Sequence, residues 1–161
     1  MLARRAALVL LLALVLVAAC MIPTIASAKS VPVEASGMWS WETETWIERV
    51  HPNGSFMAMG DENGVWTGTI SGPSHEDFVA QWDQAGDLRA TLWSTFTGAE
   101  VNGAHGDMTM WISCVAPADG SFFGGEWKIL TGTEELKHVR GEGTWWGAED
   151  GVHYAGLVWE Q

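Results

Sequence analysis

The sequence predicts an all-β protein, a small closed antiparallel barrel of about eight strands. Two observations lead to this prediction. From Gly37 onward, apolar and polar residues alternate with a period of two, and short runs rich in Gly, Pro, Asn and Asp interrupt the alternation at regular spacing. Glycines also stand inside the expected strands, which favours a barrel over a flat two-sheet sandwich, because the strands of a small barrel bend sharply and pass close to one another.

The first 28 residues have the pattern of a signal peptide. Arg4 and Arg5 precede an apolar run over residues 6–19, and Pro23 and the small residues at 26–28 follow it. The run is shorter than the roughly 20 residues that span a bilayer. We therefore expect a signal peptide at 1–28, a short linker at 29–36 and a single barrel domain at 37–161, in a secreted or periplasmic protein.

A second processing route stays open. Residues 17–20, with the sequence Val-Ala-Ala-Cys, resemble a bacterial lipobox, in which Cys20 is lipidated and becomes the first residue of an envelope-anchored protein. By either route Cys114 has no intramolecular disulfide partner, and a buried, free thiol is expected there.

The remaining chain is strongly acidic. The whole sequence carries a formal charge of −12, and loss of Arg4 and Arg5 with the signal peptide takes it to −14. Because no cluster of lysines or arginines is present, no nucleic-acid partner is expected. An anionic lipid surface would repel the chain, so membrane contact is expected only through the lipid anchor.

The expected strands follow the alternation along the chain. In the first half they lie at 38–50, 55–60, 65–71, 76–82 and 88–98, with turns or breaks between them, among them residues 61–64 and 72–74. In the second half they lie at 107–115, 122–130, 141–147 and 152–160. The only helical turn is expected within residues 134–139. Glycines interleaved with tryptophans over residues 124–147 fit a barrel whose large side chains fill the interior while glycines allow the bends.

The same stretch carries a family resemblance. Its glycines, with Trp127, Ile129 and Leu136, follow the form G-x-W-x-I-x-x-G-T-x-x-L-x-x-x-x-G-x-G-T, which is similar to prokaryotic members of the allene oxide cyclase-like superfamily, relatives of the dirigent proteins. "FTGAEVNGAHGDMTM", beginning at Phe96, resembles the hairpin upstream of this signature. The resemblance implies a calycin-like eight-stranded barrel with an apolar interior, which needs no metal or organic cofactor. One departure is Glu134, which stands where the family has a glycine, so a positive φ there would strain the turn.

The chemical candidates are few. Arg140 and Glu142 stand two apart, and alternation allows both to lie inside the barrel, where a buried carboxylate can act as an acid or a base. His75, Glu76 and Asp77 are consecutive, and because adjacent strand residues point to opposite faces, at most two of them can share a metal, so no metal site is expected. No catalytic fingerprint such as G-x-S-x-G or H-E-x-x-H is present.

The eleven tryptophans, all beyond residue 28, supply the ligand-binding candidates. Alternation allows Trp93, Trp111, Trp127 and Trp145 to point inward and line an apolar cavity. The leading hypothesis is therefore an exported barrel that binds a small hydrophobic or aromatic molecule. The alternatives are a cofactor-free cyclase or isomerase assisted by Glu142, and a structural envelope protein that forms homo-oligomers.

Overall fold

The structure is a computed structural model, and it describes residues 30–161. The expected signal peptide at 1–28, and with it the lipobox and Cys20, lies outside the described residues. Within residues 30–161, no helix is long and apolar enough to cross a membrane.

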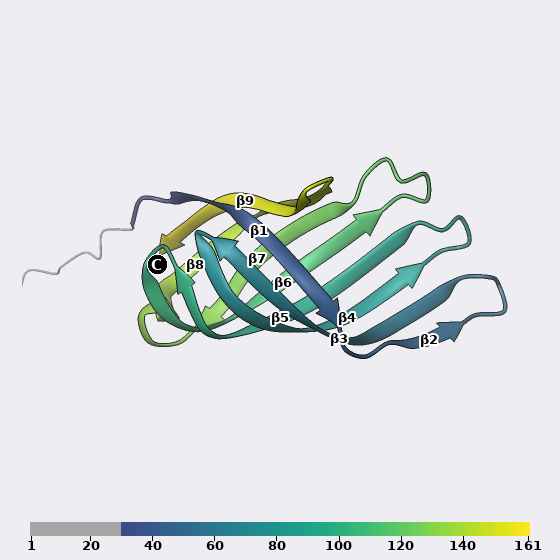
Figure 1. The fold of residues 1–161 in the computed structure, drawn as a ribbon, viewed down its shortest axis with the longest axis horizontal. Helices are drawn as coiled ribbons and strands as arrows, with labels where there is room; N and C mark the ends of the chain where they lie inside the picture. Colours follow the sequence, from purple (N-terminus) through teal and green to yellow (C-terminus); the bar gives the residue numbers. More distant parts are fainter. Residues whose placement is uncertain (1–29) are drawn as a thin grey trace, which may run out of the picture.

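Nine strands and one short 3₁₀ helix form the fold, and Figure 1 shows them in sequence colours. The strands are β1 (Val33–Thr43), β2 (Ile47–Val50), β3 (Phe56–Gly68), β4 (Ile70–Trp82), β5 (Leu88–Val101), β6 (Ala104–Ala116), β7 (Gly124–Gly132), β8 (Val139–Ala148) and β9 (Gly151–Glu160), and the helix is η1 (Glu134–His138).

The strands form a closed antiparallel barrel. From β3 to β9 each strand pairs with the next, β9 pairs with β1, and β1 closes the ring by pairing with β3. The short β2 pairs with β3 beyond the point where β1 leaves it, so it is a ninth strand outside the eight that close the barrel. The predicted all-β barrel of about eight strands is confirmed.

Two expected breaks in the chain are wrong. Residues 61–64 continue β3 and do not form a turn, and residues 72–74 form a bulge inside β4, where the register against β5 shifts between Ser71 and Ser74. Asn-Gly and Gly-Pro are turn signals, but inside a barrel strand the same residues supply the local bend. At the other boundary, β1 begins at Val33, within the stretch expected to be a linker.

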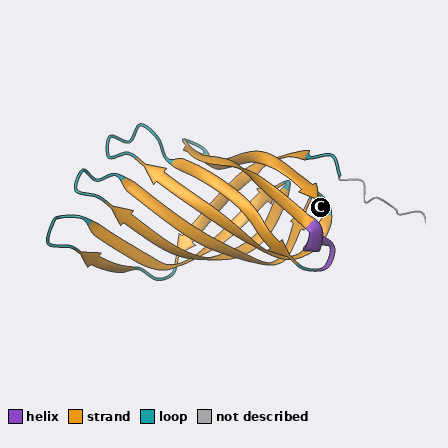
Figure 2. Ribbon diagram, turned by 180° about the vertical axis from the view of Figure 1, so that it is seen from behind, coloured by secondary structure: helices purple, strands orange, loops and turns teal. Residues whose placement is uncertain are grey.

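Glu134 adopts the positive φ that the family pattern suggested. Its φ is 50°, and it opens η1, within the stretch 134–139 where a helical turn was expected. Leu136 of η1 is buried at the end of the barrel, and Figure 2 shows the helix at the end opposite the three long loops. η1 therefore lies at one end of the barrel, while the loops extend beyond the other end, called here the loop end.

Glycines and tryptophans meet across neighbouring strands of the barrel. Trp127 of β7 lies opposite Gly143 of β8, and a Cβ on Gly143 would lie 2.8 Å from the Trp127 ring and would also collide with the carbonyl oxygen of Ala155. A Cβ on Gly156 of β9 would lie 2.6 Å from the same ring. The expected division of roles between the two residue types is therefore correct, because the indole occupies the volume that the glycines leave free.

The strained Glu134 gives a stability prediction. In Glu134→Gly the left-handed backbone no longer carries a side chain, so the free energy of unfolding should rise by about 0.5–1 kcal/mol, net of the added chain entropy of glycine. Lys137→Gly, an exposed position of the same helix without a positive φ, is the matched control and should lower stability. Urea denaturation of the three proteins measures the difference, and a loss of stability in Glu134→Gly would contradict it.

Candidate functional site

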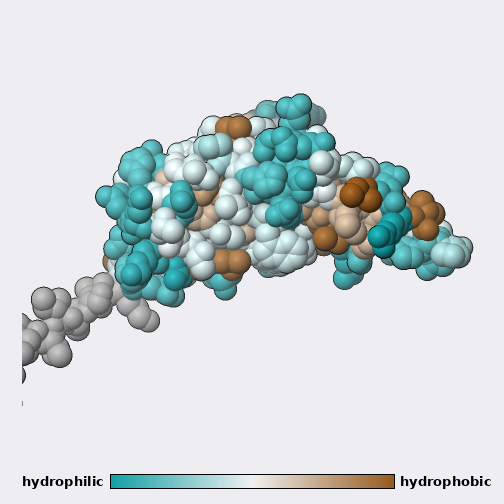
Figure 3. All heavy atoms as spheres, turned by 90° about the horizontal axis from the view of Figure 1, so that it is seen from below, coloured by the Kyte–Doolittle hydropathy of each residue, from teal (hydrophilic) through white to brown (hydrophobic). Residues whose placement is uncertain are grey.

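An apolar cavity of about 160 Å³ opens at the loop end of the barrel. Seven of the side chains that line it are aromatic: Trp39, Trp41, Trp46, Phe78, Trp82, Phe123 and Trp145. Glu62 and Thr43 are the polar side chains in its wall, and Cys114, Leu92 and small apolar residues supply the rest. In Figure 3 several of the most hydrophobic exposed side chains gather towards this end of the molecule. An apolar, aromatic wall with few polar groups is typical of a small-molecule site.

The aromatic rings hold one another in place. The Trp39 ring lies 4.8 Å from that of Trp41 and 5.5 Å from that of Trp145, edge to face in the second case. Phe123 packs edge to face on Trp145 at 5.0 Å. Such ring pairs are stabilising beyond the area they bury, so the wall is formed before any ligand arrives.

Two carboxyl groups lie buried at the inner side of this cavity. Glu62 of β3 and Glu76 of β4 are directly opposite in the strand register, and their side chains are 6% and 0% exposed. Glu76 Oε1 accepts hydrogen bonds from Ser74 Oγ at 2.8 Å, Ser94 Oγ at 3.0 Å and Trp66 Nε1 at 3.3 Å. Its second oxygen, Oε2, receives no N–H or O–H donor from those residues or from any other described residue outside the pair. Glu62 is therefore the group that can donate a hydrogen bond to this second oxygen of Glu76.

Burial raises the pKa of both groups. The pKa of Glu62 rises to about 8, first because the side chain is buried and then because Glu76 lies beside it. Burial also raises the pKa of Glu76, against the lowering effect of its hydrogen-bond donors. At neutral pH the pair therefore holds at least one proton, and a proton on Glu62 can bond to the Glu76 carboxyl.

Gly64 makes room for this arrangement. A Cβ there would collide with Ser74 Oγ and would lie 2.6 Å from Glu76 Oε1 and 3.0 Å from Trp39 Nε1. Three polar atoms thus converge over a residue without a side chain. Trp39 Nε1 is buried and has no hydrogen-bond partner among the described residues, which marks this side of the cavity as incompletely satisfied.

Cys114 is free and buried in the cavity wall, as expected from the sequence. Burial, and secondarily the charge of Glu62, raises the pKa of its thiol to about 12. At neutral pH the side chain is therefore a neutral, small apolar group and a weak nucleophile.

The four predicted tryptophans divide into two pairs. Trp145 lines the cavity, and Trp127 is buried in the barrel interior, where its Nε1 donates to Thr144 O and Ala155 O. Trp93 and Trp111 lie opposite each other on the outer wall, with Trp93 44% exposed, so the expected inward orientation is wrong for both. Alternation defines two faces of a strand but not which face is inside, and here Leu92 and Ile112 take the interior.

The expected interior position of Arg140 and Glu142 is also wrong. Glu142 is exposed and lies 4.0 Å from Lys128, and the Arg140 guanidinium donates to the carbonyl oxygens of Val139 and Lys137. Gly141, which lies between them, faces inward together with Val139 and Trp145. Both charged side chains therefore face outward.

The sequence reasoning missed Glu62 and Glu76 as a pair. The stretch 61–64 looked like a turn, which removed Glu62 from any strand face. A continuous β3 would have placed Glu62 on the same face as Ala58 and Trp66. In β4, Glu76 likewise shares a face with Phe78 and Ala80. A glutamate in register with an otherwise apolar face is the signal that identifies a buried carboxyl.

On the outer wall, the expectation that Glu76 and its neighbours face opposite sides is confirmed. His75 and Asp77 are exposed, and Asp61 of β3 lies with them, so that their ligand atoms are within 4.8 Å of one another. The site is open to water, and such surface groups are common without an ion.

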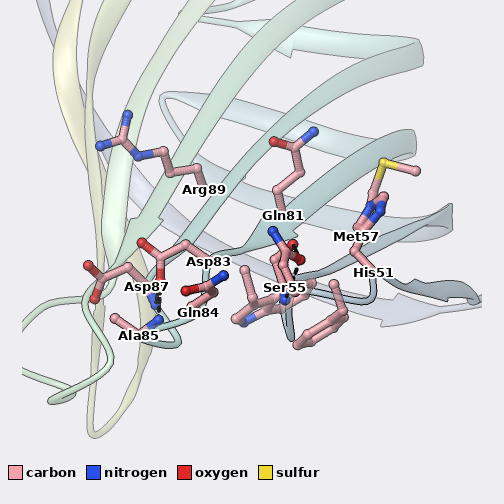
Figure 4. A pocket seen from close by; sticks show the side chains of 12 residues that line it. His51, Ser55, Met57, Gln81, Asp83, Gln84, Ala85, Asp87 and Arg89 are labelled. Carbon is pink, nitrogen blue, oxygen red and sulfur yellow. Dashed lines mark hydrogen bonds between the residues drawn. The ribbon is translucent and has the colours of Figure 1, made fainter.

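A larger groove of about 620 Å³ lies between the β2–β3 and β4–β5 loops, and Figure 4 shows the side chains that line it. These side chains are mostly polar, and the loops satisfy their own polar groups. Asp83 Oδ1 accepts from the backbone N–H groups of Ala85 and Asp87, and Asn53 Oδ1 accepts from Ser55. The groove lacks the apolar enclosure and the unsatisfied polar atoms of the aromatic cavity.

The comparisons with known proteins agree with the fold. The chain is similar to a crystal structure of a protein with unknown function from the DUF3224 family of Shewanella oneidensis MR-1, with a TM-score of 0.65. The match has 13% sequence identity and covers 80% of this chain and 96% of that one. At this identity the likeness supports the barrel fold alone. No protein-family model matches the sequence, and no curated protein matches it.

The buried carboxyl pair gives a pH prediction. Both pKa values are raised from an ordinary 4.5, so the folded protein binds more protons than the unfolded chain between about pH 4.5 and pH 8. Stability should therefore fall as the pH rises through this window, by at most about 1.4 kcal/mol per pH unit for each proton. In Glu62→Gln, which cannot ionise at this position, the fall should be reduced, while the exposed Glu142→Gln should follow the wild type. Urea denaturation at pH 5, 6.5 and 8 measures this, and equal slopes in Glu62→Gln and the wild type would contradict it.

Proposed function

We propose that the protein is an exported β-barrel that binds a small hydrophobic or aromatic molecule in the aromatic cavity. The observation that carries the proposal is the wall of seven aromatic rings around about 160 Å³ of space at the loop end. Export rests on the pattern of residues 1–28, where signal-peptidase cleavage after Ala28 and lipidation of Cys20 remain alternative routes.

Partial exposure of the rings supports binding over simple core packing. Trp41 is 38% exposed, Trp46 48% and Phe123 36%, and all three line the same cavity. Large apolar side chains gathered at one opening are typical of a surface that a ligand covers. An apolar cavity of about 150 Å³ can hold benzene, so the cavity suits a molecule with one ring and a short side chain.

The proposal predicts a difference between two tryptophans of similar exposure. Trp41→Ala removes a ring of the cavity wall and should weaken binding of 2-phenylethanol about tenfold, the loss expected for one aromatic contact. Trp93→Ala removes a ring from the outer wall and should change binding less than twofold. Titration followed by NMR chemical shifts measures both. Equal effects of the two substitutions, or no binding of 2-phenylethanol or related single-ring compounds, would contradict the proposal.

A second candidate is a cofactor-free isomerase or cyclase, the activity that the allene oxide cyclase-like resemblance suggests. One observation favours it: a carboxyl with a pKa of about 8 lies in the wall of an apolar cavity, as suits a general acid or base. In this candidate the catalytic group is Glu62 in place of the exposed Glu142.

Proton transfer by Glu62 has a direct test. Phenylacetone has one ring, a short side chain and exchangeable hydrogens beside its carbonyl group, and in D₂O a positioned base should exchange them for deuterium. Glu62→Gln should slow this exchange by at least about 100-fold, the usual contribution of a general base, while Glu142→Gln should not change it. Exchange at the same rate in wild-type and Glu62→Gln protein would eliminate this candidate.

A further inference from the structure

We propose that the ligand of the aromatic cavity is an organic cation, a primary ammonium group on a short chain attached to one aromatic ring, and that its N–H groups bind the carboxyl pair of Glu62 and Glu76. This inference rests on the proposed function, because it assumes that the cavity binds a small aromatic molecule, and it specifies the class of that molecule.

The first support is the arrangement of hydrogen bonds around the pair. Glu62 stands in the cavity wall and Glu76 lies directly beside it across the β3–β4 register. The three donors to Glu76 all reach Oε1, and Oε2 receives none from them. Within the fully buried Glu76 carboxyl, one oxygen is thus saturated, and the other is left for the proton shared with Glu62 or, once that proton has left, for a ligand donor. An ammonium group supplies three N–H donors, which match the carboxyl oxygens of the pair, and it leaves the unpaired N–H of Trp39 as it is.

The second support is the charge around the pair. Among the described residues, no Lys, Arg or His nitrogen lies within 4.0 Å of either carboxyl. The ion pairs of the described chain, Lys128 with Glu142 and His153 with Asp150, involve other carboxylates. The other titratable group that faces Glu62 is Cys114 of β6, which is neutral. The residues that face the pair from β1, β5 and β8 are tryptophans, Leu92 and Ser94, and none of them carries a charge. Two buried acids without a basic partner favour a positive ligand and disfavour an anion.

The third support is the aromatic wall itself. Trp39 packs against Trp41 and against Trp145, and all three line the cavity with Glu62. The face of an indole ring is the most favourable aromatic surface for a cation. A neutral ligand of the same shape would gain the apolar contact but neither the attraction to the rings nor the ion pair. The acidic surface of the protein, with a net charge of −12 for the whole sequence, would also steer cations towards it.

The pair couples binding to pH. An ammonium ion can pair fully with the carboxyls only after their shared proton has left. An alkyl ammonium, like a lysine side chain, keeps its charge to about pH 10. Affinity for the cation should therefore increase from pH 6 to pH 8, with release of a proton into the buffer. The affinity for a neutral analogue should not increase over this pH range.

Three probes of nearly equal size test the inference: 2-phenylethylamine, 2-phenylethanol and 3-phenylpropionate. We expect calorimetry at pH 8 and 150 mM salt to show 2-phenylethylamine binding at least tenfold more tightly than 2-phenylethanol, and 3-phenylpropionate binding more weakly than either. Repeating the titration in buffers of different ionisation enthalpy measures the proton release. Glu62→Gln should lose the preference for the amine and retain 2-phenylethanol binding. Glu142→Gln, which removes a surface carboxylate, should keep the preference.

The outcomes separate the inference from the proposed function. If 2-phenylethylamine and 2-phenylethanol bind equally well, or if Glu62→Gln keeps the preference, the cavity binds aromatic molecules and the cation inference is wrong. If 3-phenylpropionate binds most tightly, the inference is likewise wrong. If none of the three binds, the proposed function fails and the inference fails with it.

Discussion

The closeness of the strands in a small barrel is the constraint on which the rest of this structure depends. An eight-stranded barrel has an interior just wide enough for side chains, so a buried indole needs space that its neighbours leave free. Trp127 has Gly143 and Gly156 beside it, and Trp145 lies opposite Gly125. These glycines leave the space that the two indoles occupy. At the loop end, seven aromatic rings, Trp145 among them, line the cavity that remains.

That cavity lies next to two buried carboxyl groups, whose burial costs free energy. Apolar residues in place of Glu62 and Glu76 would avoid the cost of burying two carboxyls, and a buried acid pair is not by itself a source of stability. Nevertheless the surroundings are arranged for it: Ser74 and Ser94 donate to Glu76, and Gly64 leaves the space that its carboxyl occupies. Hydrogen-bonded and glycine-flanked, the pair has a defined position in the barrel, which argues for a role in binding or proton transfer.

The sequence predicts the barrel well because its signals are local. Alternation and turn residues gave the strand count, and the family pattern located the positive φ at Glu134. The site was harder to predict because it depends on which face of each strand points inward. A shift of one residue exchanges the two faces, so Trp93, Trp111 and Glu142 were expected inside although they lie outside. Glu62 was not predicted as an interior residue for a different reason: the Asn-Gly pair that follows it in β3 resembles a turn.

The ninth strand connects the fold to the rim of the site. β2 does not take part in closing the barrel, but the corner between β1 and β2 is fixed to β3, because Glu44 N and Thr45 N both donate to Asp61 O. This corner places Trp46 on the rim, 5.5 Å from Phe78 and 6.1 Å from Trp82 by ring centroids. At this end of the barrel the partly exposed rings of Trp41, Trp46 and Phe123 line the cavity. The aromatic rim and Glu62 therefore line one cavity, and under the proposed function the rings would select for aromatic ligands and the carboxyl pair for charge.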